Sequence, residues 1–335
     1  MTLARDTSFA YAVGRIRALE TRLLDRSKLE RMIDAASADE AIKILAETDY
    51  GSAVAELAAV HDFEEILQRE MALTLAELEK MSPQKDLIAL MRLRYDVLNL
   101  KILLKAKYLQ VKAELLLPLG TVPLSTLQAM VDEERFRDLP GPLRSALDRI
   151  MEEFPLTRDP QMIDLALDRV LFEQLMAEAA RLQSPFLKGL FARQIDLINL
   201  KTFIRVKRME RDRDFFKKAV LPGGRLPLDR LISLFDEPLD ALHGQLSRTD
   251  YATLIEEGVR GWMEKGSSAL LEKLADDYIT TYLQRGKRSA FGPEPLIGYL
   301  WAKEIEVKNI RLILVGKINK LSADAIRERL RDVYL

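Results

Sequence analysis

The residues of this chain best suited to chemistry form one motif that occurs three times: an acid, an asparagine three positions later, and bases five and eleven positions after the acid. An acid and an amide on one helix face can form a polar binding site, or they can fasten that helix to a neighbour. Asparagine favours caps and turns, so within an apolar helical face it needs a compensating hydrogen bond. The motif residues are Asp96, Asn99, Lys101 and Lys107; Asp196, Asn199, Lys201 and Lys207; and Glu306, Asn309, Arg311 and Lys317.

The repetition favours the structural interpretation of this motif. One active site rarely needs its residues on three separate domains, whereas a packing contact must recur with every copy of the domain that contains it. We therefore predict that the acid and the amide fasten each motif helix to a neighbouring helix end inside its own repeat. An alanine at Asn99, Asn199 or Asn309 should then lower thermal stability before it affects the binding of any partner.

Other candidates for catalysis are weak. The two histidines, His61 and His243, lie in unrelated sequence contexts. The run Gly286-Lys287-Arg288-Ser289 lacks the upstream glycine of a phosphate-binding loop. The pair Gly223-Gly224 follows a proline and is more typical of a helix-ending turn than of an anion site. We predict no catalytic residue, no cofactor site and no metal site.

The composition excludes several classes of function. Lys and Arg number 51 against 52 Asp and Glu, so no net basic field draws the chain to nucleic acid. There is no cysteine, and hence no disulfide or thiolate metal site. The first twenty residues carry charges where a signal peptide needs an apolar stretch, and no apolar run approaches the length that spans a bilayer. We expect any link to a membrane to go through another protein.

The elements that position the motif are expected to be long helices in an all-α fold. Within 83–109, apolar residues follow the spacing of one helical face, and about 26 residues at 1.5 Å each make a rod of about 40 Å. We expect Lys101, Lys105, Lys201 and Arg205 to flank this face as solvated charges. Each rod should begin at a capping residue before proline and, in two copies, end at a proline-containing turn. The starts are Ser82-Pro83, Ser184-Pro185 and Gly292-Pro293, and the turns are Leu117-Pro118 and Leu221-Pro222-Gly223-Gly224. Shorter helices should begin with capping boxes at Ser27, Ser37 and Ser125.

The motif belongs to a larger repeated unit. Residues 117–132 align without a gap with 221–236, and SKLERMID at 27–34 fits the same frame. Thr48-Asp49-Tyr50 returns as Thr249-Asp250-Tyr251. We predict three similar helical domains, at 1–116, 117–219 and 220–335.

These features together resemble a known family. Tyr11, the run Arg15-Ile16-Arg17, Leu23-Leu24 and Thr48–Gly51 resemble the start of the C-type subunit of the archaeal and bacterial V-type rotary ATPase/ATP synthase, whose eukaryotic relative is the d-type subunit. The three motif helices and the turn at 221–224 are similar to internal signatures of that family, and the resemblance spans nearly the whole chain. Leu119 departs from it, because a glycine would be expected in the first such turn.

The resemblance implies a fold, a function and partners. The fold would be a funnel of three helical domains about a pseudo-threefold axis. The protein would be a non-catalytic central-stalk subunit that joins rotor-shaft subunits of the D and F type to the membrane proteolipid ring. It would transmit torque between ATP hydrolysis or synthesis and the translocation of H⁺ or Na⁺. It would lie peripherally on the cytoplasmic side of the membrane, without spanning it and without binding nucleic acid.

Two other classes of protein remain open at this point. A cytosolic helical-repeat scaffold for protein binding would show an apolar groove along one face and would not depend on membrane fractions. A helical enzyme would need a deep pocket lined by titratable groups with strongly shifted pKa values.

Overall fold

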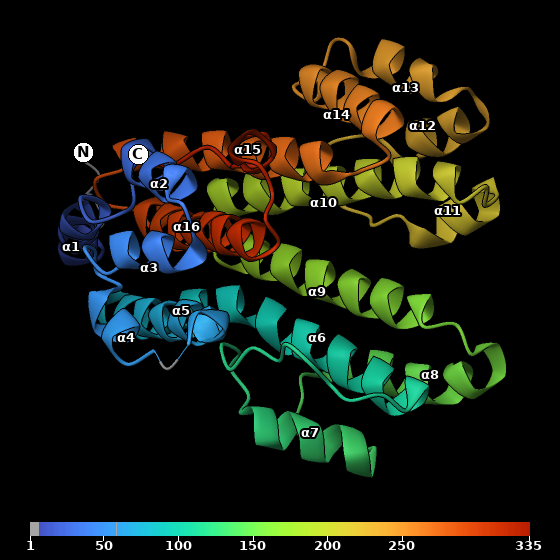
Figure 1. Ribbon diagram of the computed structural model, residues 1–335. Helices are drawn as coiled ribbons and strands as arrows, with labels where there is room; N and C mark the ends of the chain where they lie inside the picture. The colour runs from blue at the N-terminus through green and yellow to red at the C-terminus, as the bar shows by residue number, and fades with distance from the viewer. Residues whose placement is uncertain (1–6, 58) are drawn as a thin grey trace, which may run out of the picture. The chain divides into compact units, whose positions relative to one another are not determined.

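The structure is a computed structural model that describes residues 7–57 and 59–335 (Figure 1). Its described residues form helices and connecting segments and contain no β-strand, which confirms the all-α prediction. None of the helices within these ranges combines the length and the apolar composition needed to cross a membrane. The chain divides into two compact units: unit 1 comprises Met1–Gln84 and Asp240–Leu335, and unit 2 comprises Lys85–Leu239.

Unit 2 is built around α9, which contacts α6, α8 and α10. The stripe of α9 that meets these helices is apolar, with Ile163, Leu167 and Leu175 buried. The helices of unit 2 are α6 (Lys85–Leu109), α7 (Leu124–Glu133), α8 (Gly141–Thr157), α9 (Gln161–Arg181), α10 (Pro185–Arg208), α11 (Arg213–Ala219), α12 (Leu228–Ser233) and the 3₁₀ helix η2 (Leu234–Asp236).

Unit 1 is built around α16, most of whose residues are buried, and which contacts α1, α2, α3, α5 and α15. A helix of this kind is buried in a core rather than laid on a surface. The helices of unit 1 are α1 (Ala10–Glu20), α2 (Arg26–Asp34), α3 (Ala38–Leu45), α4 (Gly51–Ala55), η1 (Val60–Asp62), α5 (Phe63–Met81), α13 (Leu239–Leu246, whose first residue is the last of unit 2), α14 (Ala252–Lys265), α15 (Ala269–Gln284), η3 (Arg285–Arg288), α16 (Glu294–Ile318) and α17 (Ala323–Arg327).

The three motif helices α6, α10 and α16 have 25, 24 and 25 residues and end in the same way. Gln110, Glu210 and Lys320 adopt left-handed backbone conformations with φ of 53°, 52° and 56°. The N–H of the residue after each one bonds to a carbonyl five positions earlier, which closes the last turn as a Schellman motif. The prediction that Leu117-Pro118 and Leu221-Pro222 stop the long helices is therefore wrong. Both turns come several residues after a backbone-driven stop that needs neither glycine nor proline.

Helix starts agree with only part of the expected capping. Ser184 accepts a hydrogen bond from the N–H of Leu187, and Ser37 caps α3, whose Glu40 carboxylate accepts in return from the N–H of Ala36. The predicted caps at Ser27 and Ser125 are wrong. Asp25 takes the place of Ser27 by accepting from the N–H of Lys28, and Pro123 precedes α7 without a side-chain cap. At the other two long helices, Ser82 bonds within its own turn and Pro293 precedes α16 without a side-chain cap.

Candidate functional site

The motif residues bind backbone groups of a segment that lies elsewhere in the sequence, and we call each such arrangement a dock. Dock 1 is on α6, dock 2 is on α10 and dock 3 is on α16. Docks 1 and 2 both lie in unit 2, and dock 3 lies in unit 1. In docks 1 and 2 the bound segment follows the helix, and the expected domain boundaries assign that segment to the next repeat.

The asparagine of each dock uses both ends of its amide on one backbone residue. Its Nδ2 donates to the carbonyl of that residue, and its Oδ1 accepts from the N–H of the same residue. All three asparagines are buried, with at most 1% of the side chain exposed. These two hydrogen bonds are the compensating bonds that an asparagine needs within an apolar helix face. The pairs are Asn99 with Leu117 (2.8 and 2.9 Å), Asn199 with Leu221 (2.8 and 2.8 Å) and Asn309 with Arg331 (3.1 and 2.9 Å).

In docks 1 and 2 the acid is an aspartate that accepts from two consecutive N–H groups. Asp96 accepts from Thr121 at 2.9 Å and Val122 at 3.1 Å. Asp196 accepts from the N–H groups of Arg225 and Leu226, both at 3.0 Å. Hydrogen bonds from backbone N–H groups to a buried carboxylate are charge-assisted and stronger than neutral ones.

Glycine makes these two turns possible. A Cβ atom on Gly120 would lie 1.9 Å from Asp96 Oδ1, and one on Gly224 would lie 2.1 Å from Asp196 Oδ1. No side chain fits at such distances, so the turn reaches the carboxylate only through a glycine. The glycine expected at Leu119 is thus not the one the dock needs, because Gly120 fills that position.

In dock 3 the acid is a glutamate, and it also accepts a hydrogen bond from the backbone. Glu306 accepts from the N–H of Leu24 at 2.5 Å. In the repeat frame Leu24 precedes Ser27 by three positions, as Val122 precedes Ser125, so the N-terminal segment occupies the place of the turn. The position equivalent to Gly120 is Arg22, and the extra methylene of glutamate lets the carboxylate reach the backbone without a glycine.

The lysine that closes each motif binds carbonyl groups at the end of a short helix. Lys107 Nζ donates to the carbonyl of Val131 at 2.7 Å, near the end of α7. Lys207 binds the carbonyl of Glu237 just after η2, and Lys317 binds that of Ala35 just after α2. The last carbonyls of a helix have no partner within the helix, and a cation suits them. Each dock therefore holds both a turn and the short helix that follows it.

In docks 1 and 3 the remaining motif base pairs with an acid on a neighbouring helix. Lys101 Nζ lies 2.6 Å from Asp168 Oδ1, and Arg311 binds both carboxylate oxygens of Glu64 at 2.6 and 2.8 Å. Lys201 is half-buried and lines a pocket that also contains Asp168. The expectation that Lys101 and Lys105 are merely solvated is wrong, because Lys105 also pairs, with Asp164 at 2.6 Å. Asp164 and Asp168 lie on α9, which packs against α6 and so brings both carboxylates to the two lysines.

A buried charge cluster surrounds dock 3 and was missed from the sequence. Lys303 is 3% exposed and lies 2.8 Å from both Glu70 and Glu306, while the hydroxyl of Tyr50 donates to Glu306 at 2.8 Å. Burial opposes the charge on Lys303, yet Glu306 and Glu70 raise the pKa of this lysine above its ordinary value. Burial, and then Glu306, raise the pKa of Tyr50 well above its ordinary value. The spacing of Lys303 three positions before Glu306 was the available signal.

The weak catalytic candidates lie apart from the docks. His61 is in η1, and His243 lies 3.4 Å from Glu256 at an exposed position. Residues Gly286–Arg288 belong to η3. Within 7–57 and 59–335, no three His, Asp or Glu residues are grouped in a way that could hold a metal ion.

Comparisons with known proteins place the chain in a family. The family model described as ATP synthase (C/AC39) subunit matches residues 12–329. The C-type subunit of the V-type sodium ATPase of Enterococcus hirae is 30% identical over 320 residues, covering 95% of this chain and 97% of the relative. The C-type subunit of the A-type ATP synthase of Methanocaldococcus jannaschii is 29% identical over 347 residues, covering 96% and 86%. That of Methanosarcina acetivorans is 27% identical over 346 residues, covering 97% and 93%. The chain belongs to the ATP synthase (C/AC39) subunit family.

Proposed function

We propose that this protein is the central-stalk coupler of a V/A-type rotary ATPase, a subunit that carries torque between the rotor shaft and the membrane proteolipid ring. The observation that carries the proposal is the family match, which extends over nearly the whole chain. Family membership makes the protein a non-catalytic subunit of the rotary ATPase/ATP synthase complex. The coupling role is the finer step, and it connects ATP hydrolysis or synthesis to the translocation of H⁺ or Na⁺.

The docks support this role through stiffness. Each long helix is tied to a turn by its acid and amide and to a short helix by its terminal lysine. A helix held at several points along its length resists bending and rotation more than one held by apolar packing alone, because the hydrogen bonds fix its register. A part that transmits torque needs this property, whereas an enzyme that closes on a substrate needs mobile segments.

The proposal includes an architecture and partners. The three repeats at 1–116, 117–219 and 220–335 would form a funnel with pseudo-threefold symmetry. Rotor-shaft subunits of the D and F type and the proteolipid ring would be its partners, on the cytoplasmic side of the membrane. The Enterococcus relative is named for a sodium ATPase and the Methanocaldococcus relative for an ATP synthase, so the names of the relatives include both an ATPase and a synthase.

The test is a reconstitution with purified components. Tagged protein is mixed with a shaft subcomplex and with detergent-solubilised proteolipid ring, separately and together, and binding is measured by size exclusion and interferometry. We expect binding to each component and a ternary complex when both are supplied. A folded protein that binds neither component would contradict the proposal, and capture of soluble proteins in the absence of membrane fractions would favour the scaffold alternative.

A further inference from the structure

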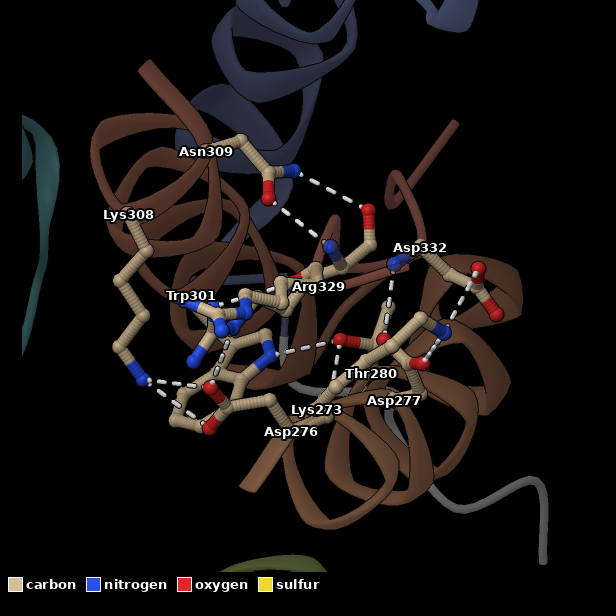
Figure 2. A network of polar contacts seen from close by, with 10 residues as sticks. Lys273, Asp276, Asp277, Thr280, Trp301, Lys308, Asn309, Arg329 and Asp332 are labelled. Atoms are coloured by element: carbon tan, nitrogen blue, oxygen red, sulfur yellow. Dashed lines mark hydrogen bonds and ion pairs between the residues drawn. The ribbon is translucent and has the colours of Figure 1, made fainter. Parts of the chain in front are cut away.

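We propose that α15, η3 and α16 form a binding site for an extended peptide, and that the chain fills this site with its own residues 330–335. We call these residues the C-terminal strap. Figure 2 shows side chains of α15 and α16 that point toward the strap. The strap follows α17 and has no regular secondary structure. The strap binds the site within one molecule, and we expect a separate peptide of the same sequence to bind in its place.

The site recognises the backbone of the strap at three successive places. Asn309 on α16 binds both the carbonyl and the N–H of Arg331. Asp277 on α15 accepts from the N–H of Asp332 at 2.8 Å. Gln284 and Lys287 donate to the carbonyl of Tyr334 at 3.1 and 2.9 Å. Binding of an extended segment through its main chain is a recurrent mode of peptide recognition, in which side-chain pockets add specificity.

Two side chains of the strap occupy specific surroundings. Tyr334 is 2% exposed, with Lys287 Nζ 4.6 Å from the centre of its ring. Gly298 on α16 makes room for it, since a Cβ there would lie 2.2 Å from the tyrosine hydroxyl. Arg331 Nε lies 3.1 Å from Asp276, an acid that also binds Lys308 at 3.0 Å. The ligand class is thus an extended peptide with a buried aromatic residue three positions after a basic one.

The other two docks indicate how tolerant this recognition is. The residues held by the dock asparagines are Leu117, Leu221 and Arg331, so the amide accepts either an apolar or a charged residue. In docks 1 and 2 the bound residue leads through one continuous loop to the N–H groups at the acid. In dock 3 the strap supplies the first part of that turn, and the segment around Leu24, far away in the sequence, supplies the second.

The strap and the N-terminal segment meet over dock 3. Val333, Tyr334 and Leu335 line a small pocket together with Leu23 and Leu24, and the motif acid and amide of α16 also line it. Occupancy of the peptide site therefore supports the hydrogen bond from Leu24 to the carboxylate. Loss of the strap should loosen Leu24 even though the two segments are far apart in sequence.

The first experiment cuts the folded full-length protein. A protease recognition sequence is inserted between Glu328 and Arg329, which are both exposed. After cleavage, a labelled peptide RLRDVYL, equivalent to 329–335, is offered and its exchange into the site is followed by fluorescence anisotropy. We expect the cut peptide to stay bound through gel filtration and to exchange saturably with the labelled one. Release of the cut peptide without uptake of the labelled one, or equal binding of a scrambled peptide, would overturn the proposal.

Variants sharpen this result. Asn309→Ala should weaken the peptide about tenfold or more, because two hydrogen bonds to its backbone are lost. Asn199→Ala removes the equivalent dock of unit 2 and should leave peptide affinity unchanged. In the peptide, Tyr334→Ala should weaken binding about a hundredfold, whereas Tyr334→Phe should bind equally or more tightly, since the tyrosine hydroxyl has no hydrogen-bond partner within the described residues. Equal loss with Asn199→Ala would show a general loss of stability and overturn the assignment.

The second experiment leaves the protein uncut. Amide hydrogen exchange is measured at Arg331, Asp332 and Leu24 in the wild type and in Asn309→Ala. We expect faster exchange at all three positions in the variant, with the amides of α9 in unit 2 unchanged. Unchanged exchange at Leu24 beside faster exchange at Arg331 would overturn the link between the strap and dock 3. Unchanged exchange at Arg331 would overturn the peptide site itself.

Discussion

The docks of unit 2 and the dock of unit 1 both bind backbone groups through an acid and an asparagine, but the chain supplies those groups by different routes. In unit 2, Asp96 and Asp196 bind N–H groups that lie 26 and 30 residues further along the chain, and glycine clears the way for the carboxylate. In unit 1, Glu306 binds Leu24, which is 282 residues away, and no glycine occupies the equivalent position. A dock is therefore specified by the backbone groups presented to it and not by the continuity of the loop that presents them.

The two regions also differ in what surrounds the acid. Asp96 and Asp196 accept from donors of the turn, and Glu306 accepts from Lys303 and Tyr50 as well as from the docked segment. The Glu306 carboxylate therefore has hydrogen-bond partners in the core of unit 1 in addition to the docked segment. Dock 3 therefore contains a buried ion cluster, and we expect disturbing its charges to destabilise the protein more than the changes in unit 2 described below.

We expect the greatest loss of stability from Lys303→Met. It leaves Glu70 and Glu306 buried without their shared cation, and breaking a buried pair in this way costs about 3–5 kcal/mol. The matched change Lys101→Met in unit 2 removes a partly exposed pair and should cost about 1 kcal/mol or less. Both tryptophans, Trp262 and Trp301, lie in unit 1, so tryptophan fluorescence during urea unfolding measures the loss in Lys303→Met, and circular dichroism measures the loss in Lys101→Met. Equal and small losses in both variants would remove the distinction between the docks.

The asparagines should come next in the size of their effect. Asn309→Ala and Asn199→Ala each remove two hydrogen bonds and leave a backbone carbonyl and N–H without these bonds, for an expected loss of about 2–4 kcal/mol. The first change should shift the tryptophan-detected transition of unit 1. The second should appear in circular dichroism and leave the tryptophan signal unchanged. Unchanged melting together with lost partner binding would show that these residues are binding residues and not fastening residues.

We expect a smaller difference in stability between a substitution in a glycine-dependent turn of unit 2 and one at the equivalent position of dock 3. Gly224→Ala places a Cβ against Asp196 and should cost about 1–3 kcal/mol, because the turn must move off the carboxylate. Arg22→Ala, at the equivalent position of dock 3, changes an exposed side chain and should cost less than about 0.5 kcal/mol. Thermal melts of both variants measure the comparison. A large loss at Arg22 would contradict the equivalence of the two positions.

A dependence on pH at the short helix held by dock 3 should be weaker still. A hydrogen bond from Arg327 lowers the pKa of Glu30 below its ordinary value of 4.5. Because the folded-state pKa is lowered, the stabilisation is present above pH 4.5 and is lost as the pH falls through the folded value. Glu30→Gln should lose a little stability near neutral pH and show a weaker decline in acid. Parallel curves for wild type and variant would contradict the role of this pair. A matched change in unit 2 is Gln128→Glu on α7, which has no such arginine partner among its described contacts and should not reproduce the wild-type decline.

Some of these features could be predicted from the sequence because they depend on neighbours within a few positions. The apolar spacing on 83–109 and the cap at Ser184 are local, and both lie close to where the structure has them. The asparagine on an apolar face also indicated that it needed a buried partner. The caps at Ser27 and Ser125 failed because neighbouring residues, Asp25 and Pro123, decided where the helix begins.

Residue order was sufficient for the all-α class, for the three motif helices and for the recurrence of their polar residues as a set, since helix formation depends on hydrogen bonds four residues apart. Which backbone segment each motif holds became known from the tertiary structure alone. Glu306 and Leu24 meet because the path of the chain brings the N-terminal segment back to α16. Lys303 can be buried with its charge because α5 places Glu70 beside it. Such partners are set by packing between distant segments, and no local pattern around either residue encodes them.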